Sequence, residues 1–158
     1  MRRSTVSVNA RISRGCRSRR SPACRGSSST RPDQGERYRS RASTEPSLRG
    51  RAVLVRTGWD ARWGSEEYWS GAPFLPETVV ERLVRAEVQL VGVDFGNVDD
   101  TADLARPAHT GLLEAGIPIV ENLRGLEQLP REGFVFSAPP IALVRGAAFP
   151  VRAFAQLE

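Results

Sequence analysis

Apolar positions along this chain are gathered into short blocks after residue 50, and the spacing within each block predicts an element of secondary structure. Residues 52–56 and 90–94 are compact apolar runs, which predicts two buried strands. Residues 76–88 lie between these runs, begin with proline and carry valine and leucine at helical spacing, which predicts an amphipathic helix. The first half of the apolar pattern therefore predicts a strand, a helix and a second strand.

A second helix and more strands follow. Residues 107–116 begin with proline and end in Ala-Gly, which are a helix start and a helix stop, and residues 117–120 form a short apolar strand. Three further short strands are predicted at 134–140, 141–146 and 150–157, separated by proline or glycine. This alternation predicts an α/β fold with one compact mixed sheet and with its loops gathered at one rim.

His109 is the only histidine of the chain, and Glu121 directly follows the strand at 117–120. From His109 to Glu114 the predicted helix runs about 8 Å at ~1.5 Å per residue. The strand then returns roughly 13 Å at ~3.3 Å per residue. If the turn at Gly116 reverses the chain, His109 and Glu121 finish near the same rim. An imidazole and a carboxylate there could bind a metal or share a proton. The alternative is that both are solvated surface residues.

Residues 1–48 differ in composition, because they are dominated by arginine, serine, proline and glycine. Such a stretch has few apolar groups to offset chain entropy, which predicts a disordered leader ahead of a folded domain at 51–158. It has no apolar core of a secretory signal, and its composition is typical of an organelle transit peptide. A reading-frame error in GC-rich DNA and a basic RNA-binding arm are the other two interpretations.

Net charge divides the chain at the same place. Residues 1–50 carry thirteen arginines and three acids, whereas residues 51–158 carry ten arginines and fifteen acids. The predicted domain is therefore acidic, which argues against nucleic acid as its partner. The chain has no lysine, so a lysine nucleophile is excluded, and both cysteines lie in the leader. No apolar run approaches the ~18 residues needed to span a membrane.

The loop after the first strand is rich in aromatic residues: Trp59, Trp63, Tyr68, Trp69 and Phe74. All three tryptophans of the chain lie in it. A loop of this kind can line the site of an aromatic substrate, or it can form a lid that packs on the core. Both interpretations stay open, and Trp59, Trp63 and Tyr68 are the candidate substrate-binding residues.

Four segments occur in a characteristic order: VLVRTGW, LVRAEVQLVGVDFGNVD, PAHTGLLEAGIPIVENL and PPIALVRGAAFPVRAFA. Together they resemble the C-terminal two-thirds of the cyclase superfamily, the metal-dependent hydrolases that include bacterial kynurenine formamidase. The resemblance covers about residues 51–158. It rests on the combination of the four segments, because none of them is specific alone.

The resemblance implies a compact cyclase-like α/β fold of the swivelling β/β/α type, assembled as a homodimer or larger. It implies a hydrolase of an amide or related bond that uses zinc or manganese. The implied substrate is a small molecule such as an N-formyl aromatic amine of tryptophan catabolism. By the family's P-x-H and I-x-E-N-L patterns, His109 and Glu121 bind the metal or lie beside it and act in catalysis, and Trp59 lies at the mouth of the site. We expect a cytoplasmic protein, or an organellar one if the leader is a transit peptide.

The sequence departs from the family at its main metal motif, H-x-G-T-H-x-D, because the chain has a single histidine. A catalytic zinc site normally has three protein ligands, so Asp94 or Asp99 would have to add an oxygen to His109 and Glu121. We therefore expect an N-terminally incomplete domain with weak or absent activity. The alternative function is a non-catalytic relic that binds partners. Residues 51–158 alone should aggregate or need a partner chain, because sheet edges would be unpaired.

Overall fold

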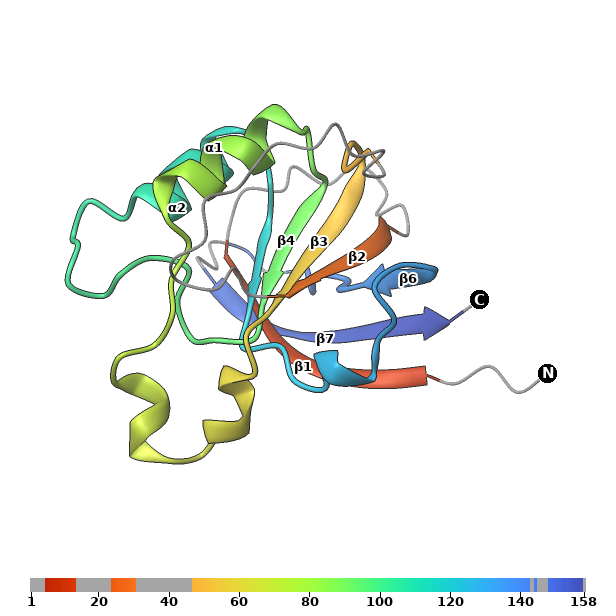
Figure 1. Ribbon diagram of the computed structural model, residues 1–158, viewed down its shortest axis with the longest axis horizontal. Coiled ribbons are helices and arrows are strands. Elements are labelled where there is room, and N and C mark those ends of the chain that lie inside the picture. The colour runs from red at the N-terminus through yellow and green to blue at the C-terminus, as the bar shows by residue number, and fades with distance from the viewer. Residues whose placement is uncertain (1–4, 14–23, 31–46, 143, 145–147, 158) are drawn as a thin grey trace.

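Two helices pack on one side of a sheet that closes on itself (Figure 1). The computed structural model of this protein describes residues 5–13, 24–30, 47–142, 144 and 148–157. Within these residues the strands are β1 (Thr5–Ser13), β2 (Cys24–Thr30), β3 (Arg51–Arg56), β4 (Leu90–Val93), β5 (Ile119–Glu121), β6 (Phe134–Ser137) and β7 (Ala148–Leu157). The helices are α1 (Glu77–Arg85) and α2 (Pro107–Glu114).

The sheet has the strand order β1-β5-β4-β3-β2-β6-β7, and β7 pairs back with β1. Strands β2, β3, β4 and β5 are parallel to one another, whereas the pairings made by β6, by β7 and by β1 with β5 are antiparallel. Helix α1 connects β3 to β4, and α2 connects β4 to β5. This arrangement confirms the predicted α/β fold with a mixed sheet.

Both faces of the central strands are buried, which explains their continuous apolar sequences. On β3, Ala52 and Leu54 belong to one core cluster together with Phe134, Phe136 and residues of β7. The intervening Val53 belongs to a second cluster, which lies between the sheet and the helices and includes Val80 of α1 and Leu112 of α2. Neither helix in the described part of the chain has the length and apolar character needed to cross a membrane.

The predicted helices and central strands are confirmed, with shifted ends. Helix α1 ends at Arg85 rather than at residue 88, because Glu87 takes a left-handed backbone with φ 51° and the Val88 N–H bonds the Leu83 carbonyl. The predicted strand at 141–146 falls partly outside the described residues. Residues 141, 142 and 144, which are described, are not in a strand.

Strands β1 and β2 lie within residues 1–48, for which the composition predicts disorder. Strand β1 pairs with β5 and β7, and β2 lies between β3 and β6. A signal for β1 is present in the sequence, since apolar and polar residues alternate through TVSVNARI, which is typical of a strand. Because arginine and serine are abundant around this stretch, its alternation of apolar and polar residues was not recognised as a strand pattern. The rest of the predicted leader, apart from Ser47 and Leu48, lies outside the described residues.

Candidate functional site

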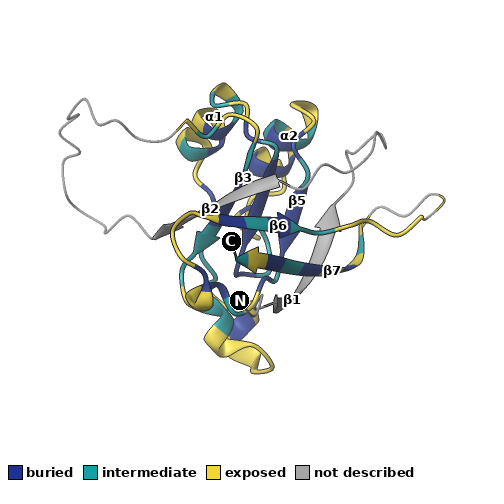
Figure 2. Ribbon diagram, turned by 90° about the vertical axis from the view of Figure 1, so that its right-hand side faces the viewer, coloured by how far each residue is buried: buried dark blue, intermediate teal, exposed yellow. Residues whose placement is uncertain are grey.

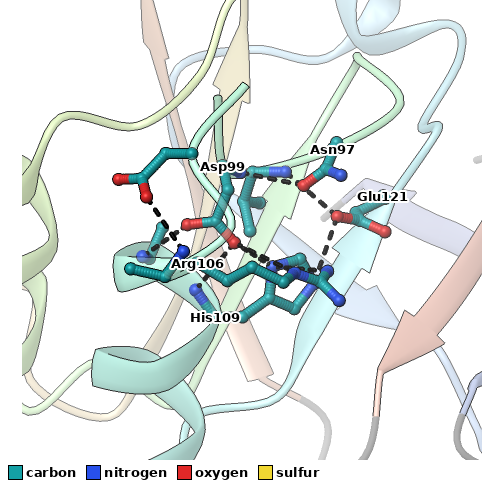
Figure 3. A network of polar contacts seen from close by, with 9 residues as sticks. Asn97, Asp99, Arg106, His109 and Glu121 are labelled. Carbon is teal, nitrogen blue, oxygen red and sulfur yellow. Dashed lines mark hydrogen bonds and ion pairs between the residues drawn. The ribbon is translucent and has the colours of Figure 1, made fainter. Parts of the chain in front are cut away.

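The structure brings His109 and Glu121 together at one rim of the sheet. His109 lies in the first turn of α2, and Glu121 is the last residue of β5. The chain between them turns at Gly116, whose positive φ of 74° is a conformation that glycine adopts readily. As a result, the imidazole Nε2 lies 3.5 Å from the Glu121 Oε1 (Figure 3). Both residues are buried. The predicted convergence is therefore confirmed, and the alternative of two solvated surface residues is wrong.

Asp99, in the loop after β4, contacts Nδ1 of His109, the ring nitrogen other than the one that lies near Glu121. Its Oδ2 lies 2.5 Å from the imidazole Nδ1, and its carboxylate also accepts the backbone N–H groups of Ala108 and His109 at 2.6 and 3.3 Å. A carboxylate at the first turn of a helix interacts favourably with the helix dipole. Because an ionised carboxylate only accepts hydrogen bonds, it fixes the imidazole proton on Nδ1 and leaves Nε2 directed to Glu121.

Glu121 is a buried carboxyl group with few partners in the described part of the chain. The Val98 N–H donates to its Oε1 at 3.0 Å. Burial raises the pKa of the Glu121 carboxyl above its ordinary value, and the Val98 hydrogen bond, His109 and Arg106 act against this rise. A carboxyl group with a raised pKa beside an imidazole is a suitable pair for holding or moving a proton.

Arg106 also belongs to this group, although it was not among the site residues predicted from the sequence. Its Nη2 lies 3.1 Å from both ring nitrogens of His109, and its Nε lies 3.6 Å from the Asp99 Oδ2. Arg106 precedes α2 with a left-handed backbone, φ 51°, which is uncommon for a residue other than glycine. The one available signal was its position three residues before His109, within reach of one helical turn.

Asp94 does not contribute to the His109 group. Its carboxylate accepts three hydrogen bonds of 2.7 Å, from the backbone N–H groups of Thr57 and Gly58 and from the Thr57 hydroxyl. Burial raises the pKa of Asp94, and these hydrogen bonds oppose the rise. Of the two aspartates considered as a third metal oxygen, Asp94 therefore supports the turn after β3, and Asp99 lies beside Nδ1.

The aromatic segment after β3 is attached to the residues that follow Glu121. Tyr68 is buried, and its hydroxyl donates to the Asn122 Oδ1 at 2.8 Å. The Trp59 Nε1–H donates to the Tyr68 carbonyl at 2.9 Å, and Asp60 accepts the Gly125 N–H at 3.2 Å. Trp59 and Tyr68 thus have protein partners for their polar groups, and they fasten the segment beside the end of β5.

Trp63 and Trp69 have large exposed surfaces in the same segment. They are 43% and 66% exposed, and each ring meets Tyr68 edge-on at about 5 Å between centroids. Figure 2 shows this segment as the mostly exposed excursion at the bottom of the molecule, below the buried strands. Of the three candidate substrate-binding residues, Trp63 presents the largest open aromatic surface, and contact of any of them with a substrate stays a prediction.

The donor atoms present fit only part of a metal site. His109 Nε2 and the Glu121 carboxylate are two ligands of the types that zinc and manganese take, whereas a catalytic zinc site normally has three protein ligands. Over the described ranges, no cluster of three or more His, Cys, Asp or Glu side chains is arranged to hold a metal ion. The residues described therefore do not complete the metal site that the resemblance implies.

Comparison with known proteins gives one family. The family model described as putative cyclase matches residues 20–100. Kynurenine formamidase of Polaromonas naphthalenivorans (strain CJ2) is 35% identical over 101 residues, which are 64% of this chain and 43% of the relative. The family match begins upstream of residue 51, and so includes β2 and part of the segment predicted to be a leader.

Solved structures that resemble this chain point to the same family. Isatin hydrolase A from Ralstonia solanacearum has a TM-score of 0.64 and 29% sequence identity, over 71% of this chain and 47% of that chain. A potential metal-dependent hydrolase with cyclase activity has a TM-score of 0.60 and 26% identity, over 70% of this chain and 53% of that chain. This chain thus spans about half the length of the relatives that it matches.

Proposed function

This chain belongs to the cyclase family, and we propose from that membership that it is a hydrolase of amide bonds in small molecules. The observation that carries the proposal is the convergence of His109 and Glu121, held by Asp99, at one rim of the sheet. The same two positions match the P-x-H and I-x-E-N-L patterns of the family. Its activity is expected to be weak or absent, because the single histidine of the sequence leaves the H-x-G-T-H-x-D motif unfilled.

The substrate class that we propose is an N-formyl aromatic amine, and a cyclic amide of an aromatic ring is the closest alternative. Relatives named kynurenine formamidase and isatin hydrolase support these two classes. The exposed ring of Trp63 and the neighbouring Trp59 supply aromatic surface close to the residues that follow Glu121. Planar aromatic substrates pack well on such rings.

Each of the site residues has a proposed part in the reaction. Asp99 holds the imidazole so that Nε2 faces Glu121, and it keeps the proton on Nδ1. Glu121, whose pKa is raised by burial, holds or transfers a proton next to the position where a leaving amine would depart. His109 and Glu121 are also the two proposed ligands for zinc or manganese, and further ligands have to come from outside this pair.

Formate release from an N-formyl aromatic amine, measured with the full chain and with added Zn²⁺ or Mn²⁺, tests this function. Activity should depend on metal and should fall at least tenfold in His109→Ala, in line with losses of general acid–base groups. Arg85→Ala, at an exposed position of α1, is the matched control and should keep the wild-type rate. A chain that binds no divalent metal and releases no formate is not an enzyme of this class.

A non-catalytic, partner-binding module is the second candidate function. It is favoured by the incomplete metal ligand set among the described residues. If residues 1–48 act as a basic arm in that role, binding to nucleic acid should weaken steeply with salt and should be lost when they are deleted. Binding that persists without residues 1–48 would rule out a role for this segment as the arm.

A further inference from the structure

The guanidinium of Arg106 lies against the face of the His109 ring. Its Nη2 is 3.1 Å from Nδ1 and 3.1 Å from Nε2 of that ring (Figure 3). A nitrogen equally close to both ring nitrogens cannot lie along the in-plane bonding direction of either, so the contact is made with the face of the ring. Arginine packs on aromatic faces through its charge and its flat surface, without a directed hydrogen bond. The contact therefore positions Arg106 and leaves its N–H donors for other partners.

Few of these donors have an acceptor in the described part of the chain. A guanidinium carries five N–H donors and no acceptor atom. Apart from the two contacts with the His109 ring, the polar contact of the Arg106 side chain with the described residues is the ion pair from Nε to the Asp99 Oδ2 at 3.6 Å. The fork formed by the N–H groups of arginine matches the two oxygens of a carboxylate, which it binds through two parallel hydrogen bonds.

Arg106 is also the member of this cluster that reaches solvent. Its side chain is 54% exposed, whereas Asp99, His109 and Glu121 are buried. The positive charge of Arg106 opposes the rise in the pKa of Glu121, so the guanidinium acts within electrostatic reach of that carboxyl group. A dissolved anion that pairs with Arg106 is thereby brought next to His109 and Glu121.

The chemistry proposed for the site produces such an anion. Hydrolysis of an amide by water breaks the C–N bond and gives an amine and a carboxylic acid, and the acid is ionised at neutral pH. The carboxyl groups of Asp99 and Glu121 repel a further carboxylate when they are ionised. A carboxylate can therefore stay at this place only beside a cation, and Arg106 is the arginine that contacts the cluster in the described part of the chain.

We propose that Arg106 is the carboxylate-binding residue of this site, and that it gives the site a preference for anionic ligands. The inference rests on the amide hydrolysis proposed above. The carboxylate can come from two sources: an acid group carried by the aromatic substrate, or the formate that hydrolysis releases. Arg106 acts here as a specificity-determining residue, and the bond-breaking step does not pass through it.

The single histidine of the chain allows binding to be followed at the site, because the imidazole ¹H and ¹³C resonances belong to His109 alone. Full-length protein is titrated separately with benzoate, with its neutral counterpart benzamide, and with formate. Benzoate should bind more tightly than benzamide by on the order of tenfold, as expected for a charge-assisted hydrogen bond. Formate that binds while benzoate does not would identify the released acid as the ligand of Arg106. Equal binding of benzoate and benzamide without binding of formate, or no binding of either carboxylate, overturns the proposal.

Three variants separate recognition by Arg106 from a structural effect. Arg106→Gln removes the charge and retains a long side chain, and it should bind the carboxylates on the order of tenfold more weakly while benzamide binding stays unchanged. Arg106→Lys keeps the charge without the fork and should restore part of the preference. Arg85→Gln, at an exposed position of α1, should bind as the wild type does. Carboxylate binding that is unchanged in Arg106→Gln overturns the proposal.

The titrations need no turnover, so this inference and the proposed function can fail separately. A protein that binds benzoate or formate through Arg106, and releases no formate from an N-formyl aromatic amine, retains the carboxylate-binding role and loses the hydrolase function. A protein that releases formate, and binds carboxylates equally well as wild type and as Arg106→Gln, retains the function and loses the role of Arg106.

Discussion

The phenolic hydroxyl of Tyr68 donates a 2.8 Å hydrogen bond to the side-chain oxygen of Asn122. The two residues are 54 positions apart, and Asn122 directly follows Glu121. Asn122 has a left-handed backbone with φ 60°, a conformation that asparagine tolerates better than most residues. Burial raises the pKa of Tyr68, so its hydroxyl stays protonated as a donor. This contact ties the aromatic segment to the end of the strand that carries Glu121.

Replacing Tyr68 with Phe should lower the free energy of unfolding by about 1 kcal/mol, since one buried hydrogen bond is lost and the Asn122 side chain loses its partner. Urea unfolding of Tyr68→Phe, Asn122→Ala and the double variant measures the effect. The two single changes should not be additive, because both remove the same bond. Additive losses would show that the two side chains do not support each other.

Replacing Asp94 with Ala should lower the free energy of unfolding by about 2 kcal/mol, because the buried N–H groups of Thr57 and Gly58 and the Thr57 hydroxyl lose their acceptor. Asp94 accepts hydrogen bonds from Thr57 and Gly58 in a buried place, so water cannot replace the missing acceptor. Asp100→Ala is the matched control, since exposed Asp100 accepts one backbone N–H, from Ala102. Equal losses in the two variants would contradict the role given to Asp94.

The carboxyl group of Glu121 should make stability depend on pH in a defined direction. Burial is the main cause that raises its pKa above the ordinary value of 4.5, so the folded protein holds this proton more tightly than the unfolded chain. The contribution of Glu121 to stability is therefore fully present below about pH 4.5 and is lost as the pH rises through the raised pKa.

Glu121→Gln removes this titration, and its amide oxygen can still accept the Val98 N–H. With a metal chelator present, the stability of the wild type relative to Glu121→Gln should fall as the pH is raised from 4 toward 8. Glu81→Gln, at an exposed position of α1, should show no such trend relative to the wild type. If the wild type instead became more stable relative to Glu121→Gln as the pH rises, the pKa of Glu121 would be lowered and not raised.

Deletion of residues 1–48 should produce a chain that aggregates or assembles with a partner. Strand β1 pairs along its whole length with β7 and also with β5, and β2 lies between β3 and β6. Their removal leaves four strands with unpaired backbone groups. Light scattering after size-exclusion chromatography, compared with a deletion of residues 1–4 alone, measures this. A monodisperse monomer of residues 49–158 that unfolds cooperatively would contradict the prediction.

Local signals were sufficient for the elements that carry the site. Proline at the start of α2 and glycine after its end define that helix, and the apolar runs at β3, β4 and β5 define the strands beside it. The proximity of His109 and Glu121 could be predicted from the rise per residue of a helix, the rise per residue of a strand and the chain reversal at Gly116. The partners of His109 did not follow, because Asp99 lies in a loop ten residues away and Arg106 depends on an unusual left-handed backbone.

Sequence patterns were enough to predict the order of helices and strands after residue 50, apart from the strand expected at 141–146, and to predict the family and the pair of His109 and Glu121. These follow from periodicity and from short motifs, which act over a few residues. The support that the Asp94 carboxylate gives to the turn at Thr57 and Gly58, and the position of Arg106 over the imidazole, became visible in the three-dimensional structure. The same is true of the pairing of β1 and β2 with the rest of the sheet. Such contacts depend on strand register and side-chain direction, which are set when distant segments pack together.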